Sequence, residues 1–154
     1  MRSLVSEIIN ALYGVWLIAI RRPGASGFFN ISVYGFWRSF AAAALVFPAN
    51  IIITSVGIFA ASDPSYGIYE GLRNVMIYII TWLFYPLLVL HISDFLGAGN
   101  RALRYLIPYN WASIPTGYFF AIASVLGGME IGGAVGESLG AWALFLAYIF
   151  AIFL

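Results

Sequence analysis

Cysteine is absent from this chain of 154 residues, and histidine occurs once, as His91. Without cysteine the chain has no disulfide, no thiolate nucleophile and no Cys-based zinc or iron–sulfur site. A single histidine also argues against a metal site built from several imidazoles of one chain. We therefore expect neither a metal nor another cofactor.

Charge is scarce as well, because charged residues make up 8% of the chain and hydrophobic residues 63%. A soluble domain carries about 25% charged and about 45–50% apolar residues. Four long segments hold no charged residue at all: 39–62, 74–93, 105–129 and 138–154. The sequence therefore predicts an all-α membrane protein. Its net charge of +1 provides no basic surface for nucleic acid.

Four transmembrane helices are expected within a membrane domain of residues 39–154. A helix needs about 20 apolar residues to cross the hydrocarbon core of a bilayer. Three of the charge-free segments meet that length, and 138–154 comes close to it with 17 residues. The expected spans lie near 39–61, 74–95, 106–127 and 130–154. Pro48 and Pro86 lie inside the first two spans. Backbone carbonyls freed by these prolines should face other helices and not lipid.

The residue pattern of 1–22 predicts an amphipathic helix that lies in the membrane interface. One face of it carries small and polar residues, Ser3, Glu7, Asn10 and Gly14, and the other carries Leu4, Ile8, Leu12 and Trp16. Its charge-free stretch, 8–20, is shorter than a comfortable span. A tilted fifth span is the alternative. Residues 23–38 should form a surface connector rich in turn residues and aromatic side chains.

The arginines predict an orientation, because short cytoplasmic loops are enriched in basic residues. With four spans, six arginines fall on one side: Arg2, Arg21, Arg22, Arg38, Arg101 and Arg104. Arg73 alone falls on the other side. We therefore place both termini in the cytoplasm. A fifth span would move only Arg2 across. The chain stops within an apolar run at Leu154, so we also expect a further tail.

Several polar residues should gather where the spans end at the cytoplasmic side. His91 and Asp94 share a helix face near the end of the second span, Arg38 opens the first, Arg101 lies in the next loop and Asn110 opens the third. One hypothesis is a site that handles protons or anions. The other is a structural Arg38–Asp94 ion pair, which we favour because these groups lie at the interface and not at the bilayer centre.

Glycine recurs at every fourth position near the end of the chain, as Gly128, Gly132, Gly136 and Gly140. On a helix these residues form a smooth ridge that allows close helix packing, although a glycine-rich loop is the alternative. Ser138 lies within a G-x-S-x-G pattern, but the helical context and the distant His91 argue against a serine hydrolase. Glu130 and Glu137 are expected to be solvated loop acids, or else to line an external vestibule.

Two short stretches, Gly35-Phe36-Trp37-Arg38-Ser39-Phe40 and Tyr109-Asn110-Trp111-Ala112, resemble segments of short, uncharacterised bacterial inner-membrane proteins. The order of a cytoplasmic N-terminal segment and clustered spans, over roughly residues 10–125, is also distantly similar to Yip-type membrane domains. Those domains usually have five spans, whereas four are expected here. The resemblance implies a multi-pass protein of the bacterial inner membrane with a role in membrane organisation, and it supplies no site residues.

We expect a non-enzymatic protein that acts as an accessory, assembly or scaffold subunit of a larger membrane complex. The loops are too short to hold a soluble active site, and the glycine ridge and interfacial helix offer binding surfaces. Its expected partners are the lipid bilayer and other membrane proteins or a second copy, with no nucleic acid. A small oligomeric transporter or channel is the alternative function.

Overall fold

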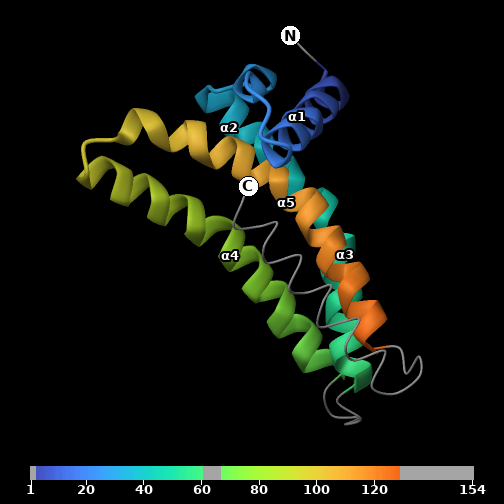
Figure 1. Ribbon diagram of the computed structural model, residues 1–154. Coiled ribbons are helices and arrows are strands. Elements are labelled where there is room, and N and C mark those ends of the chain that lie inside the picture. Colours follow the sequence, from blue (N-terminus) through green and yellow to red (C-terminus); the bar gives the residue numbers. More distant parts are fainter. Residues whose placement is uncertain (1–2, 61–66, 129–154) are drawn as a thin grey trace.

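The computed structural model describes residues 3–60 and 67–128, and the secondary structure of this part of the chain is helical throughout. In chain order the elements are α1 (Leu4–Ala19), the short 3-10 helix η1 (Ala25–Phe28), α2 (Val33–Ser39), α3 (Ala41–Ala60), α4 (Gly67–Phe95) and α5 (Gly99–Gly128) (Figure 1). The predicted all-α class is confirmed. The fourth predicted span and the ridge glycines Gly132, Gly136 and Gly140 lie outside the described residues, whereas Gly128 ends α5.

Two helices of the described part of the chain are long and apolar enough to cross a membrane. They cover Val33–Gly57, which joins α2 to most of α3, and Gly67–Phe95, which is α4. The first begins inside the predicted connector, because the hydroxyl of Ser32 accepts a hydrogen bond from the backbone N–H of Gly35 at 3.0 Å and caps α2. The second begins before residue 74, and Glu70 in its first turn pairs with Arg73.

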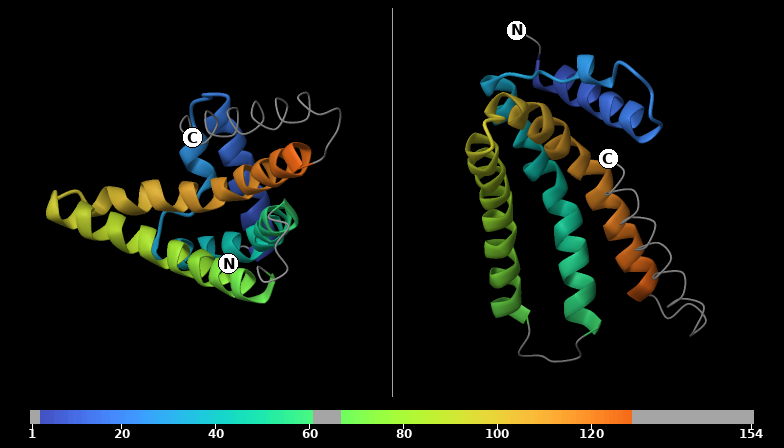
Figure 2. Two further views of the ribbon diagram at one scale, coloured as in Figure 1. Left: turned by 90° about the horizontal axis from the view of Figure 1, so that it is seen from below. Right: turned by 60° about the vertical axis from the view of Figure 1, so that its left-hand side comes forward.

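Helix α1 lies crosswise at one end of the molecule and packs against α5 and η1 (Figure 2). The hydroxyl of Ser3 caps its start by accepting from the N–H of Ser6 at 3.2 Å. It ends in a Schellman motif, in which the N–H of Arg21 donates to the carbonyl of Ile18 at 2.9 Å. Arg21 adopts a positive φ of 53°, a conformation more often taken by glycine.

Helices α3 and α5 run side by side and make the largest contact between two elements (Figure 1). Gly117 of α5 permits this approach, because a Cβ there would lie 2.7 Å from Cγ1 of Val46. Ala42 and Ala49 of α3 are completely buried. Small residues thus bring the two helices together, as they do in membrane proteins.

Tyrosine hydroxyls from two other helices donate to the backbone of α3 near Pro48. Tyr78 of α4 donates to the carbonyl of Ala43 at 2.6 Å, and Tyr118 of α5 donates to that of Leu45 at 3.0 Å. Proline has no N–H, so it cannot bond the carbonyl four residues earlier, which lies between these two acceptors. The neighbouring helices therefore supply donors where the backbone of α3 is interrupted.

The apolar core sits at the end of the molecule where α1, η1, α2 and α5 meet. Its buried members are Ala11, Val15, Phe29, Phe36, Ala42, Leu106, Ile107, Trp111 and Ala112. The third predicted span, 106–127, lies within the 30 residues of α5, which contains Pro108 and Pro115 and bends along its length (Figure 1). The bend carries α5 from beneath α1 to the side of α3.

Candidate functional site: a polar junction and an aromatic cavity

A buried ion pair joins α1 to α2. Nε of Arg38 lies 2.6 Å from Oε2 of Glu7, and Glu7 is 7% exposed. The guanidinium also donates through Nη1 to the hydroxyl of Tyr34 at 2.8 Å. Gly14 lets α1 pack closely against the connector that carries Phe29, because a Cβ at Gly14 would lie 2.8 Å from the ring of Phe29. The Glu7–Arg38 pair thus fixes α1 against the rest of the protein by charge as well as by packing.

A hydrogen-bonded chain beside this pair joins α5 to α2. The Asn110 amide donates through Nδ2 to Oγ of Ser39 at 2.8 Å, and Ser39 donates to the carbonyl of Phe36 at 2.6 Å. Ser39 and Asn110 are both completely enclosed. Most buried polar groups in proteins are hydrogen-bonded in this way, because an unpaired one is costly. We use the term polar junction for the set Glu7, Arg38, Ser39 and Asn110.

The polar junction corrects the cluster that we expected from the sequence. Arg38 and Asn110 do lie in it, but the carboxylate that contacts Arg38 belongs to Glu7 and not to Asp94. The Asp94 carboxylate instead approaches Gly99 at the N-terminus of α5, where the helix dipole favours a negative charge. His91 and Arg101 are exposed on the hairpin that α4 and α5 form.

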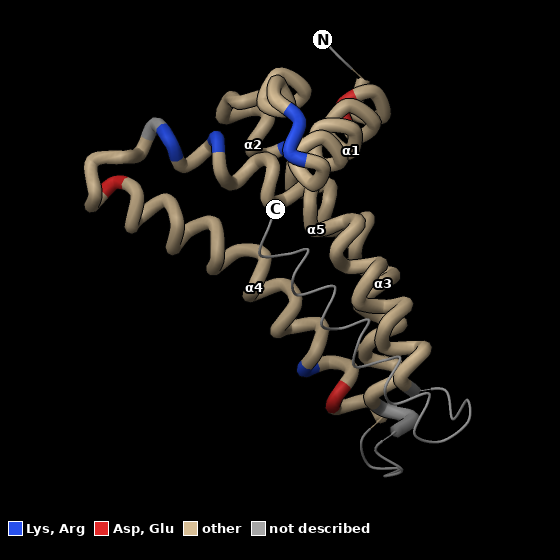
Figure 3. Tube along the Cα trace, viewed as in Figure 1, with Lys and Arg blue, Asp and Glu red and all other residues tan. Residues whose placement is uncertain are grey.

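The shape of the α4–α5 hairpin explains this difference. The end at which α4 passes into α5 projects away from α2 (Figure 1), and the acidic and basic positions at that end are separate from those beside α1 (Figure 3). Asp94 and Arg38 are therefore held on different parts of the molecule, although both regions lie at the end of the molecule that carries α1 and the α4–α5 turn. The spacing of residues places Glu7 on the small and polar face of its helix, but no local pattern shows that this face meets Arg38.

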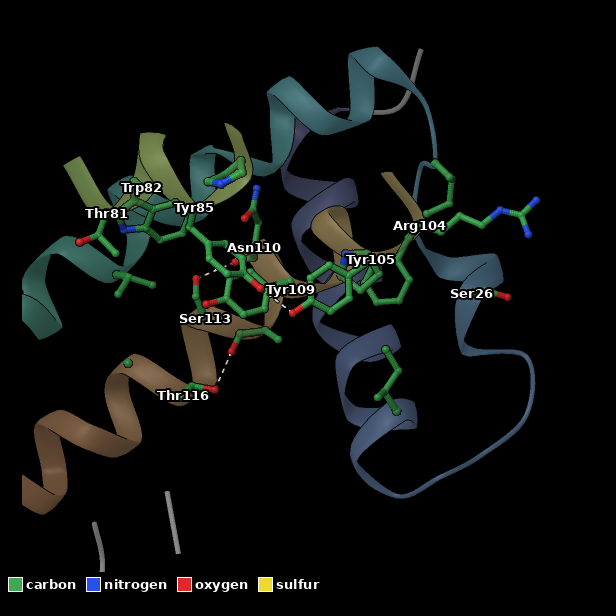
Figure 4. A pocket seen from close by; sticks show the side chains of 18 of the residues that line it. Ser26, Thr81, Trp82, Tyr85, Arg104, Tyr105, Tyr109, Asn110, Ser113 and Thr116 are labelled. Carbon is green, nitrogen blue, oxygen red and sulfur yellow. Dashed lines mark hydrogen bonds between the residues drawn. The ribbon is translucent and has the colours of Figure 1, made fainter. Parts of the chain in front are cut away.

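A cavity of about 1000 Å³ lies between α4 and α5 and reaches the connector that follows α1. Its polar lining residues are Ser26, Thr81, Arg104, Asn110, Ser113 and Thr116 (Figure 4). Aromatic side chains line much of the remainder: Phe29, Trp82, Tyr85, Tyr105, Tyr109 and Phe120. Ligand pockets commonly combine an apolar, aromatic wall with a few polar groups in this way.

Three tyrosines hold the hairpin together where it borders the cavity. The hydroxyls of Tyr85 and Tyr105 lie 2.6 Å apart, and the rings of Tyr85 and Tyr109 have centroids 4.6 Å apart. Tyr105 and Tyr109 stack with centroids at 5.8 Å. The sequence contained a signal for this last pair, because residues four apart are neighbours on a helix. The contribution of Tyr85 from α4 was not apparent from the sequence.

The chemistry available at these two places is hydrogen bonding and charge pairing. The described part of the chain has no group of three or more His, Asp and Glu side chains that could hold a metal ion. The cavity offers one guanidinium, from Arg104, together with hydroxyl groups and aromatic faces. Comparisons of the chain with protein-family models, curated proteins and solved structures found no match.

Proposed function

We propose that this is a multi-pass protein of the bacterial inner membrane, with four transmembrane spans and α1 in the interface. The outer surface of α4 supports this placement. In its most apolar stretch of 18 residues, only 6% are buried. Ile68, Leu72, Met76, Phe84 and Leu87 are among the large side chains that point outward. Water would not tolerate so large an apolar surface, whereas lipid chains or other apolar helices would cover it.

The sidedness of α1 supports an interfacial position. Its buried residues are Glu7, Ala11, Gly14 and Val15, whereas Val5 is 65% exposed and Ile9 62% exposed. A helix on the surface of a soluble domain buries its apolar face instead. With 16 residues, α1 is about 24 Å long, and it lies crosswise to the apolar helices (Figure 2). Both properties suit a helix within the interface better than a fifth span.

The distribution of arginine supports a cytoplasmic N-terminus. Most of the basic positions lie at the end of the molecule that carries α1 and the α4–α5 turn, and one basic position lies near the start of α4 at the opposite end (Figure 3). Arg21, Arg22, Arg101 and Arg104 are all exposed at the first of these ends. The positive-inside rule then places that end in the cytoplasm.

Within the membrane we propose that the protein is a non-enzymatic accessory, assembly or scaffold subunit that binds other membrane proteins or a second copy. The observation that carries this proposal is the position of α4, which contacts its neighbours through aromatic residues such as Tyr78, Trp82 and Tyr85. Against the rest of the described chain, few residues in the apolar stretch of this helix of 29 residues are buried. An apolar helix with so few buried residues is suited to packing against another membrane protein.

Site-specific photocrosslinking in living cells tests the proposed subunit role. A photoreactive amino acid at Leu83 or Leu87 should yield a discrete heavier species that contains this chain and one particular protein or a second copy. The same amino acid at Ile122, which is exposed on α5, is the background position. Crosslinks to lipid alone at all three positions, with a monomer in mild detergent, would contradict the proposal.

The cavity supports a second candidate function, a small oligomeric transporter or channel. Its volume of about 1000 Å³ is large enough for a small solute. A transport site built from Arg38 and Asp94, the less favoured hypothesis from the sequence, is not assembled, because Arg38 contacts Glu7. If the protein transports an anion through the cavity, flux in reconstituted vesicles should fall in Arg104→Gln, which changes a lining residue, and stay unchanged in Asp94→Asn, which does not. Unchanged flux in Arg104→Gln would contradict transport through this cavity.

A further inference from the structure

The cavity between α4 and α5 has a charged side chain, Arg104, at one end, and aromatic rings and uncharged polar groups along the rest of its lining. Arg104 and Ser26 lie at one end of the view, Thr81 and Trp82 at the other, and Tyr105 and Tyr109 lie between them (Figure 4). Among the described lining residues Arg104 is the one with a formal charge, and none is a carboxylate. A ligand that fits this lining has an anionic group at one end and an apolar body.

From this distribution we infer that the cavity binds the headgroup phosphate of an anionic phospholipid at Arg104, with an acyl chain along Trp82, Tyr109 and Phe120. The inference rests on the proposed membrane placement, which puts the arginine-rich end at the depth of the cytoplasmic headgroups. Basic pockets between transmembrane helices on the cytoplasmic side commonly bind anionic headgroups. The cavity volume of about 1000 Å³ exceeds what a headgroup alone needs, so it also accommodates part of a chain.

The geometry supplies both donors and shape for such a lipid. Arg104 is exposed, so its guanidinium is accessible to a phosphate. The hydroxyl of Ser26 comes from the connector after α1, and therefore a bound headgroup would contact two parts of the chain that are distant in sequence. The Tyr85–Tyr105 hydrogen bond of 2.6 Å holds the aromatic wall in place and does not involve the guanidinium of Arg104. The bound lipid would then lie between α5 and the N-terminal segment and contact both.

Arg101 provides a matched control for Arg104. Both are exposed arginines on the first turns of α5, but Arg101 does not line the cavity. Full-length protein is purified in mild detergent and titrated with dioleoyl phosphatidylglycerol or dioleoyl phosphatidylcholine, and bound lipid is counted by native mass spectrometry. Wild type and Arg101→Gln should retain one phosphatidylglycerol in preference to phosphatidylcholine. Arg104→Gln should bind it on the order of fivefold more weakly.

A second pair of variants tests whether the lipid occupies the cavity and not merely the charged surface. Ser113→Phe and Thr81→Phe each place a ring into the cavity from a different helix, so that a folding defect in one leaves the other informative. Either well-folded variant should retain less phosphatidylglycerol than wild type, although Arg104 is intact. Equal binding by Arg104→Gln and Arg101→Gln, or undiminished binding in the filled variants, would overturn the inference.

Two further arms separate the alternatives. Excess inorganic phosphate should leave the bound lipid in place, whereas displacement by phosphate would show that the site recognises the phosphate group alone. Carbonate extraction of cell membranes tests the placement on which the inference depends. A protein that resists extraction but does not distinguish the two arginine variants refutes the lipid site only. A protein released by carbonate refutes the proposed membrane placement itself.

Discussion

At the scale of single residues, the Glu7–Arg38 pair decides how the N-terminal helix is attached. Its carboxylate and guanidinium are 9% and 18% exposed as side chains, so water screens the pair weakly. Such a pair is costly to break from one side, because the remaining charge stays enclosed without its partner. The Arg73–Glu70 pair differs, since the side chain of Arg73 is 52% exposed. The two pairs therefore allow a direct comparison within one molecule.

Glu7→Gln should lower the free energy of unfolding in detergent more than the matched change in the Arg73–Glu70 pair does, because it leaves the Arg38 charge without its counter-ion. Glu70→Gln, the matched change in the pair whose arginine is exposed, should cost less than about 1 kcal/mol, because water solvates the Arg73 charge that it leaves. Chemical unfolding followed by circular dichroism measures both values. In the double variant of Glu7→Gln and Arg38→Gln part of the loss should be recovered, and strict additivity of the two changes would show that the pair is not coupled.

The Ser39–Asn110 bond leads to a second prediction at this scale. Ser39→Ala removes the acceptor of the Asn110 amide in a fully enclosed place, and should destabilise the protein by about 1–3 kcal/mol. Ser113→Ala provides a control, since Ser113 bonds only to a carbonyl of its own helix, at 2.6 Å. Thermal unfolding of both variants measures the difference. An equal loss in the two would show that the bond between α2 and α5 contributes nothing.

At the scale of elements, α3 and α5 form the most extensive contact among the described helices, while Tyr78 and Tyr85 connect α4 to both of them. Gly117 and the buried alanines of α3 allow the close approach of the first pair. Because small residues determine that distance, added volume cannot be absorbed without moving a whole helix. The backbone carbonyls near Pro48 were expected to face other helices, and donors from α4 and α5 reach the carbonyls of Ala43 and Leu45.

Gly117→Ala should destabilise the protein by about 1–3 kcal/mol, because the new methyl group would overlap Cγ1 of Val46. Val46→Ala in the same chain should restore much of this loss by removing the obstructing atoms. Gly71→Ala is the control, since nothing lies within 4 Å of a Cβ at that position of α4. Melting temperatures in one detergent compare the three proteins, and a harmless Gly117→Ala would contradict the close contact.

At the scale of the whole molecule, the charge distribution and the crosswise position of α1 support the same proposed orientation, with the α1 end of the molecule in the cytoplasm. The absence of cysteine makes this orientation easy to test, because any introduced thiol is the only one present. Ser3 and Ser26 flank α1, and both are exposed. Ile68, near the start of α4, is 84% exposed at the opposite end.

Single-cysteine variants should report a cytoplasmic N-terminal region. With a membrane-impermeant maleimide, Ile68→Cys should be labelled in cells with a permeabilised outer membrane but an intact inner membrane. Ser3→Cys and Ser26→Cys should be labelled only after the inner membrane is opened. Labelling of Ser3→Cys together with Ile68→Cys in intact cells, while Ser26→Cys stays protected, would show that α1 is a fifth span.

The sequence by itself determined the helical class and the two membrane-length apolar helices, because both follow from composition and from the lengths of charge-free segments. It also identified the small and polar face of α1, which depends only on spacing within one helix. Only the tertiary structure decided which groups meet. Ser39 and Asn110 are 71 residues apart. The sequence also contains several carboxylates that could pair with Arg38, and only the structure shows that Glu7 does so. The same holds for the cavity, since the bend of α5 and the position of the connector place Arg104 and Ser26 on one wall. Local patterns cannot encode such contacts, because they arise when helices pack against one another.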